Sequence, residues 1–284
     1  MTHILFRLFI VALTLSSSAC SWNYTSQSGT LIQGDSRLVE QARPVEQAQA
    51  LEVVNEAMIG LDLTVRMGAD AALSVSADGN LLPMIRTEMH GTTLKIWVDG
   101  NVRSRQRIKV VYSARQLERL VARGSGTVTV SALNGDALDL VNFGSVDISL
   151  SGKLDRLKVD NSGSGTVDAS AVSSAHTTVR MNGAGKVDGG RLAGGTLNVA
   201  VNGSGNFIAA GSVRELDATV NGSGRIDLAR LASEVAALSS NGAGSITAAV
   251  TRTVRPQTTG AGSIRIQGAP SVERSSGSRI SYVP

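Results

Sequence analysis

A glycine-rich signature returns about every twenty residues through the second half of the chain. Its closing glycines are spaced 18 to 21 residues apart, at Gly126, Gly144, Gly165, Gly185, Gly205, Gly224, Gly244 and Gly262. A fixed period of this size is typical of a repeat architecture, in which each repeat packs on a near copy of itself. The period therefore restricts the fold more than any local secondary-structure pattern does.

Each repeat has the same pattern on both sides of its glycines. Apolar and polar residues alternate before the signature, as at Leu197, Val199 and Val201, which is the pattern of a half-buried strand. Two residues after the closing glycine every repeat has an apolar residue, and we expect these side chains to stack inside the fold. They are Val128, Val146, Val167, Val187, Phe207, Ile226, Ile246 and Ile264.

Two folds can use this pattern, and they differ in whether the turns must resemble one another. The first is an antiparallel meander with a tight Asn-Gly turn at each signature. The second is a β-helix, in which each repeat forms one coil and the coils stack about 4.8 Å apart. Only stacked coils require similar corners. We therefore predict an all-β fold: a single-stranded right-handed parallel β-helix with coils of about 20 residues, preceded by a β-strand leader.

We interpret the residues of the signature as structural corners. Two glycines around one small residue allow positive φ and close approach of stacked backbones. Asn182, Asn202, Asn221 and Asn241 hold one position in four consecutive coils, where their amides can form a hydrogen-bonded ladder. The corner glycines are Gly124, Gly126, Gly163, Gly165, Gly183, Gly185, Gly203, Gly205, Gly222, Gly224, Gly242 and Gly244. A phosphate-binding loop is the alternative, but such loops open a helix and include a lysine.

The N-terminus has the layout of an export signal. An apolar stretch from Ile4 to Leu15 is too short to span a bilayer as a mature helix, and small residues follow it up to Cys20. Bacterial lipoprotein signals are similar, because they end at a cysteine that receives lipid. We predict lipidation of Cys20, the chain's one cysteine; the alternative is ordinary cleavage that leaves a free thiol. Several acyl chains would anchor the protein stably to a membrane.

The chain divides into five segments by composition and periodicity. We predict a signal peptide over 1–19, a tether over 20–35, an N-terminal β leader over 36–120, the glycine-rich β-helix repeats over 121–268 and a frayed C-terminal tail over 269–284. The leader lacks the glycine period but shows period-two alternation, as at Leu61, Leu63 and Val65.

The repeated Asn-Gly-Ser-Gly corner resembles the hallmark of the GIN domain family, described as the head of autotransporter adhesins. The leader is similar to that family too, in Glu40 and Arg43, in the segments that begin at Leu61 and Thr93, and in the run that begins at Ile108. The resemblance covers about residues 36–268. It implies a right-handed β-helical fold and a setting in the cell envelope or at the cell surface. It implies adhesion in general terms and little chemistry, and we expect no cofactor. As an exported lipoprotein, the chain is predicted to lie in the outer membrane or periplasm of a Gram-negative bacterium.

Aspartate follows the inward apolar residue in several repeats. Asp147, Asp168 and Asp188 fall in consecutive coils, which in register would place their carboxylates about 4.8 Å apart. Like charges directly opposite each other disfavour a sheet, so water, a basic neighbour or a cation must offset them. We favour a solvated acidic stripe and predict no metal site. Calcium held by the three carboxylates is the alternative.

Four basic residues fall at alternate positions just before the first coil. Arg103, Arg105, Arg107 and Lys109 would share one face of a strand. They are the candidate ligand surface, with phosphate or carboxylate groups of envelope polysaccharide as the ligand. A solvated outer face is the plainer interpretation.

A carbohydrate-active enzyme is the second function class, because some β-helical proteins cleave acidic polysaccharides. Its site would need Asp168 and Asp188 to meet a base such as Lys158 or Arg180. The sequence contains no nucleophile-elbow motif and no zinc-binding helix motif, so we assign no catalytic residue.

Composition narrows the class of partner. The formal net charge of +4 is small for 284 residues and aromatic residues make up only 3% of the chain, so we predict no nucleic-acid partner. We predict a non-catalytic, exported and lipid-anchored module, adhesin-like or a scaffold, that binds envelope polysaccharide or a protein. A purely structural protein that self-associates through its end coils is the third alternative.

Overall fold

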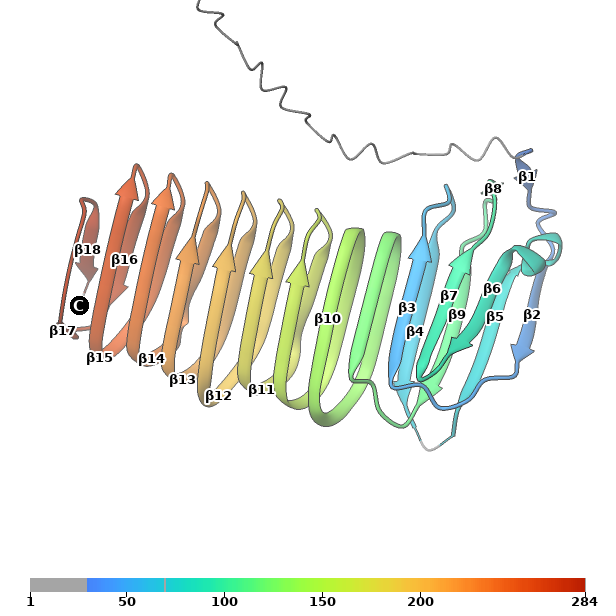
Figure 1. Ribbon diagram of the computed structural model, residues 1–284, viewed down its shortest axis with the longest axis horizontal. Helices are drawn as coiled ribbons and strands as arrows, with labels where there is room; N and C mark the ends of the chain where they lie inside the picture. Colours follow the sequence, from blue (N-terminus) through green and yellow to red (C-terminus); the bar gives the residue numbers. More distant parts are fainter. Residues whose placement is uncertain (1–29, 69, 284) are drawn as a thin grey trace, which may run out of the picture.

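The predicted parallel β-solenoid is confirmed by a computed structural model, which describes residues 30–68 and 70–283 (Figure 1). The predicted signal peptide, Cys20 and most of the tether lie outside the described residues. The coils stack in sequence order, and each pairs in parallel with the next. They consist of β10 (Arg119–Asn161), β11 (Thr166–Met181), β12 (Lys186–Val201), β13 (Asn206–Val220), β14 (Arg225–Gly242), β15 (Ser245–Gly260) and β16 (Ser263–Gln267).

The leader continues the same parallel stack, but not in sequence order. The strands β3 (Ala50–Asn55) and β4 (Leu61–Met67) pair with the first coil of β10. Next, β7 (Thr93–Val98) pairs with β3, and β9 (Ile108–Ala114) pairs with β4. The strands β3 and β4 satisfy the backbone groups that the first coil would otherwise expose at its edge, and β7 and β9 do the same for β3 and β4.

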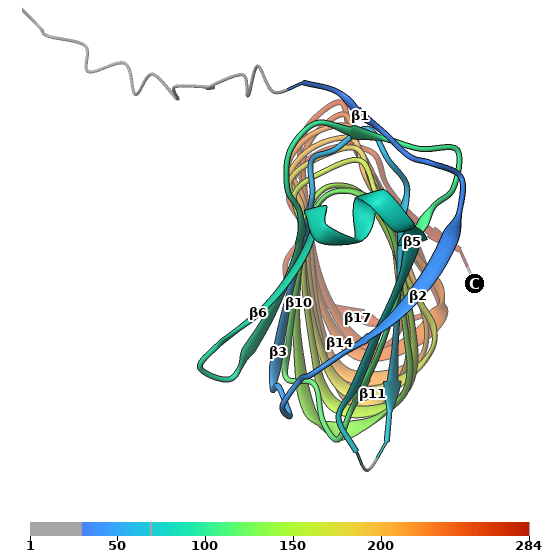
Figure 2. The same cartoon turned by 90° about the vertical axis from the view of Figure 1, so that its right-hand side faces the viewer.

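Antiparallel strands and a short 3₁₀ helix close the N-terminal end. The outer strands are β5 (Ala72–Asp78) on β9, β2 (Leu38–Arg43) on β5, and β6 (Ile85–His90) on β7. Figure 2 shows the helix η1 (Gly79–Met84) lying across the end of the solenoid, and its Leu81 is buried. The stack therefore ends in a cap that covers its apolar interior.

The described end of the predicted tether is ordered, which corrects its boundary. Ile32–Gln33 form β1, which pairs in parallel with β8 (Val102–Arg103). The Asn80 side chain donates to the Gln33 carbonyl at 2.8 Å and accepts from the Asp35 amide at 3.0 Å. Because these bonds hold residues 32–35 against the cap, they belong to the leader.

The second repeat is aligned differently from our prediction. Gly144 lies beside Gly163 rather than Gly165, because a Cβ built on Gly163 would lie 1.9 Å from the Gly144 carbonyl oxygen. Val146 takes the place of a closing glycine, and Ile148 stacks on Val167. The shift is two residues, so the strand's alternation is kept and Val146 still points inward.

The remaining inward stack is confirmed. Val167 pairs with Val187, which pairs with Phe207, and the series continues through Ile226, Ile246 and Ile264. These side chains are 0–1% exposed. Gly189 makes room for the one aromatic ring in this series, because a Cβ there would lie 2.8 Å from the Phe207 ring.

Two sets of side-chain amides support the corners. On the outside, the predicted ladder is present: Asn202, Asn221 and Asn241 each donate from Nδ2 to the Oδ1 of the asparagine one coil earlier, at 2.8–3.0 Å. On the inside, the buried Asn142 and Asn161 donate to the carbonyl four residues later, at 2.9 and 3.1 Å. The inner amides were not predicted from the sequence.

The predicted frayed tail instead forms the last partial coil. The strand β17 (Ser271–Val272) pairs with β15, and β18 (Ile280–Val283) pairs with β16, both in parallel. The exposed backbone edge of the preceding coil explains the order, because it offers a complete set of hydrogen-bonding partners.

The close stacking of glycines gives a testable consequence. A methyl group on Gly183 would lie 2.3 Å from the Gly163 carbonyl oxygen, so Gly183→Ala must push two coils apart. We expect the free energy of unfolding to fall by about 1–3 kcal/mol, as in overpacked cores. Urea denaturation followed by circular dichroism measures the change.

Gly135→Ala is the matched control, because a Cβ there meets nothing within 4 Å. Equal stability of the two variants would contradict the steric account of the corner glycines.

Candidate functional site

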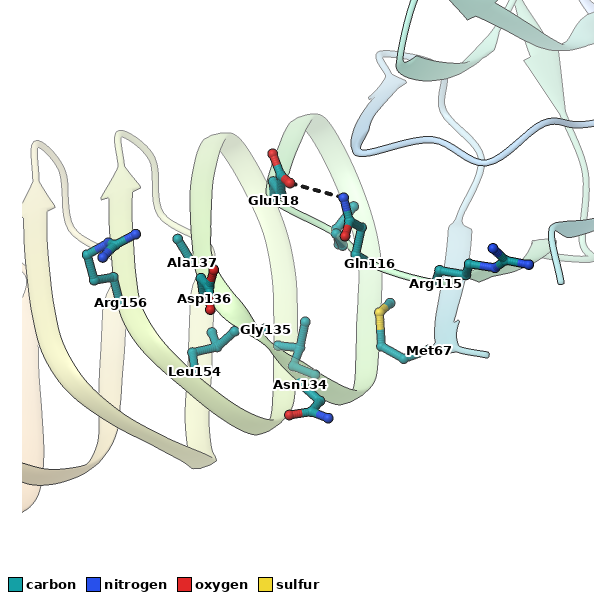
Figure 3. A pocket seen from close by; sticks show the side chains of 12 residues that line it. Met67, Arg115, Gln116, Glu118, Asn134, Gly135, Asp136, Ala137, Leu154 and Arg156 are labelled. Carbon is teal, nitrogen blue, oxygen red and sulfur yellow. Dashed lines mark hydrogen bonds between the residues drawn. The ribbon is translucent and has the colours of Figure 1, made fainter. Parts of the chain in front are cut away.

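A hollow of about 630 Å³ lies where the leader meets the first coils (Figure 3). The end of β4, the β9–β10 connection, the first coil and the second coil form its walls. The lining residues are Met67, Arg115, Gln116, Leu117, Glu118, Leu133, Asn134, Gly135, Asp136, Ala137, Leu154 and Arg156.

The bend of the first coil produces this hollow. Ala132 has φ 61°, a left-handed conformation that costs a non-glycine residue energy. The exposed segment Asn134–Asp136 follows it, between the buried Leu133 and Leu138. Strained backbone of this kind concentrates at functional sites, so it marks the bend as a place to look for function.

A second depression, of about 430 Å³, continues the hollow along the solenoid. It shares Asn134, Gly135 and Leu154 with the first. Its other lining residues come from the next three coils and are Lys153, Asp155, Ser173, Ser174, Ala175 and Ala193. We call the two depressions together the axial groove, because their residues lie on successive coils.

The charges in the groove are mixed and partly paired with each other. The Gln116 side chain donates to Glu118 Oε1 at 3.1 Å, and Arg156 pairs with Asp155 at 3.2 Å (Figure 3 shows the first contact). Hydroxyl, amide, carboxylate and guanidinium groups therefore line a groove open to solvent. Such groups can bind the hydroxyls and charges of a polar ligand.

Lys158 and Asp168, two of the residues named for an enzyme, are held by other partners. Lys158 Nζ lies 3.0 Å from Asp160 Oδ2 and 3.1 Å from Asp139 Oδ1, and these contacts raise the pKa of Lys158. Asp168 accepts the Ser170 amide at 2.9 Å, and its hydrogen bonds with Ser170 lower the pKa of that carboxyl. Neither group is poised as a proton donor or acceptor at neutral pH.

The three predicted aspartates do not form one row. Asp168 and Asp188 are level in neighbouring coils, but Asp147 is level with Thr166, because the second repeat is shifted. Asp147 accepts the Thr166 amide at 3.0 Å, and Asp188 accepts the amide of Gly190 at 2.9 Å. Asp147 thus connects two coils, whereas Asp168 and Asp188 support local backbone turns. The described residues contain no group of three or more side chains suited to hold a metal ion.

The prediction that four basic residues share one face of a strand is also wrong. The chain leaves strand conformation between β8 and β9, so Arg103, Arg105, Arg107 and Lys109 do not share one strand. Arg107 instead pairs with Asp62 through two bonds of 2.6 and 2.7 Å. The other three are exposed on the leader, outside the axial groove.

The family of the chain follows from comparison with family models. The model described as "Putative auto-transporter adhesin, head GIN domain" matches residues 56–188 and 169–270. The chain belongs to the GIN domain family. The predicted resemblance is thereby confirmed, and no curated protein matches the chain.

Solved structures show the same fold at low sequence identity. A "putative adhesin" from Parabacteroides distasonis has a TM-score of 0.63 and 19% identity, with 89% of this chain and all of the other covered. A second putative adhesin, from Parabacteroides merdae, has a TM-score of 0.63 and 17% identity, with 90% of this chain and all of the other covered. A "putative lipid binding protein" from Parabacteroides distasonis has a TM-score of 0.64 and 20% identity, again with 90% of this chain and all of the other covered. These likenesses establish the GIN fold alone.

Within the described ranges, no helix of this GIN domain has the length and apolar character needed to cross a membrane.

The Asp62–Arg107 pair gives a pH-dependent prediction. Its hydrogen bonds lower the pKa of Asp62 from the ordinary 3.8, so the stabilisation is complete above 3.8 and is lost as the pH falls through the folded-state pKa. Because both side chains are partly exposed, we expect Arg107→Gln to lower the free energy of unfolding by only about 0.5–1 kcal/mol at pH 7. Urea denaturation at neutral and acidic pH measures the difference.

The difference in the free energy of unfolding between wild type and Arg107→Gln should shrink in acid. The control variant Arg105→Gln should match wild type at either pH. A difference that grew on acidification would contradict the assignment.

Proposed function

We propose that this GIN domain is a non-catalytic binding module of the cell envelope, exported and anchored to the membrane by a lipid on Cys20. It presents the outer surface of a rigid solenoid to a polysaccharide or a protein. The axial groove carries the proposal, because it combines polar and charged side chains from successive coils in one open depression. The family description and the named neighbours fit a binding or adhesin-like role in general terms.

The character of the groove favours binding over catalysis. Enzyme sites bring titratable groups with strongly shifted pKa values together in a concave, water-poor site. Here the groove is open, and among its described residues the carboxylates and bases are paired locally or exposed. A repetitive surface gains affinity by repeating weak contacts rather than by one deep pocket.

Filling the groove tests the proposal directly. The Gly135 position is open, so Gly135→Trp would place an indole in the groove without disturbing the core. We expect this variant to lose retention on the polysaccharides that bind the wild-type domain. Affinity electrophoresis against a panel of neutral and acidic polysaccharides measures retention, and a reducing-end assay on the same mixtures should stay flat.

Ala243→Trp is the matched control, because Ala243 is exposed at a corner away from the groove. Unchanged retention of Gly135→Trp, or steady release of reducing ends, would overturn the proposal.

The anchor requires a separate experiment on the full chain in a Gram-negative host. Mass spectrometry of the mature N-terminus should find a lipid-modified Cys20, and the protein should fractionate with membranes. Cys20→Ser should move it to the soluble fraction, since the mature chain would then lack acyl chains. An unmodified Cys20 in the wild-type protein would contradict lipid anchoring.

A further inference from the structure

Three basic residues share one register position, on every second coil. Lys153 is level with Ser173, and Ser173 is level with Arg191. Arg191 is in turn level with Ala210, and Ala210 with Arg230. The order along the axis is therefore basic, small, basic, small, basic. We call Lys153, Arg191 and Arg230 the cation row.

Strand alternation fixes the direction of these side chains. Each basic residue is followed by a buried leucine, Leu154, Leu192 or Leu231, so each must point away from the core. All three are exposed. None has a hydrogen bond or ion pair within the described part of the chain, whereas Arg119, Arg156 and Lys158 are paired with aspartates.

The row adjoins the axial groove. Lys153 and Ser173 belong to the groove lining, and Ala193, two residues after Arg191, belongs to it too. The side chains between successive cations, Ser173 and Ala210, are small, so the surface does not rise between the cations. Since stacked strands are about 4.8 Å apart, successive cations lie about 9.6 Å apart along the axis. That distance is close to the length of one disaccharide unit in an extended glycan.

We propose that the cation row binds an extended acidic polysaccharide with one negative charge per disaccharide, lying parallel to the solenoid axis on the face that begins at the axial groove. This inference rests on the proposed binding function and names its ligand class. A single exposed ion pair contributes little, so affinity must come from repetition. The solenoid holds its cations at a constant interval, so a matching polymer meets all three without deforming the protein.

The test uses hyaluronan as the probe, because its uronate alternates with an uncharged sugar, and dextran of similar length as the neutral polymer. We expect the wild-type domain to bind hyaluronan and not dextran, and the binding to weaken as salt rises. Changing Lys153, Arg191 and Arg230 together to Gln should weaken hyaluronan binding about tenfold or more, since three exposed contacts are lost at once. Biolayer interferometry measures the change.

The matched control removes the same charge from the leader. Arg103, Arg105 and Lys109 changed together to Gln should leave hyaluronan binding within about twofold of wild type, because these residues belong to the leader and share no register position with one another or with the cation row. If both triple variants lost hyaluronan affinity equally, binding would depend on net charge alone, and the proposed role of the cation row would be contradicted.

A spacing variant separates position from charge. Arg191→Ala combined with Ala210→Arg keeps three cations, but it changes their separations from two and two coils to three and one. We expect this variant to bind hyaluronan nearly as weakly as the triple Gln variant. If the spacing variant bound hyaluronan with wild-type affinity, the proposed match between the cation spacing and one disaccharide would be contradicted.

The outcomes also separate this inference from the proposed function. The wild-type domain could instead be retained on a neutral glycan. If Gly135→Trp abolished that retention and the triple Gln variant kept it, the role of the cation row would be contradicted and binding in the axial groove would be supported. Failure of the wild-type domain to bind any glycan or protein partner would overturn both.

Discussion

Backbone contact between stacked coils sets the geometry of the whole solenoid. At the corners, the glycine of one coil lies against the carbonyl of the coil before it. A Cβ on Gly183, Gly203 or Gly222 would lie 2.3–2.5 Å from that oxygen. No side chain fits in this space, so the corner column stays glycine while hydrogen bonds connect the coils, as from Ser204 N to the Gly183 carbonyl at 3.1 Å. The regular rise of the solenoid follows from this contact.

A regular rise has a functional consequence, because it converts sequence periodicity into spatial periodicity. Residues about twenty positions apart become axial neighbours, so any outward side chain that recurs is repeated at a constant interval. The asparagine ladder uses this property for stability, through amides that bond from coil to coil. The cation row has the same geometry but is left without partners in the described structure. Repeated groups that have no structural partner are the better candidates for contact with a ligand.

Much of the fold, and little of the site, could be predicted from residue patterns. The solenoid and the stack from Val167 to Ile264 followed from the glycine period and strand alternation. The second repeat misled the alignment, because Val146 replaces a closing glycine and only the backbone contact of Gly144 reveals the true register. Asp147 was misplaced for the same reason. The basic stretch failed differently, since Arg107 turns aside to pair with Asp62, which lies 45 residues earlier.

Residue patterns alone show that the chain is a stack of similar coils with an apolar interior, because steric fit at a glycine and alternation along a strand are local properties. The tertiary structure decided which outward residues meet. Register between coils depends on bulges whose position no single repeat reveals, such as the shift between Asp188 and Arg191. The axial groove arises where the leader's strands join the first coil, and the cation row appears only once Lys153, Arg191 and Arg230 are brought level. Both are long-range arrangements, which backbone pairing between distant segments creates.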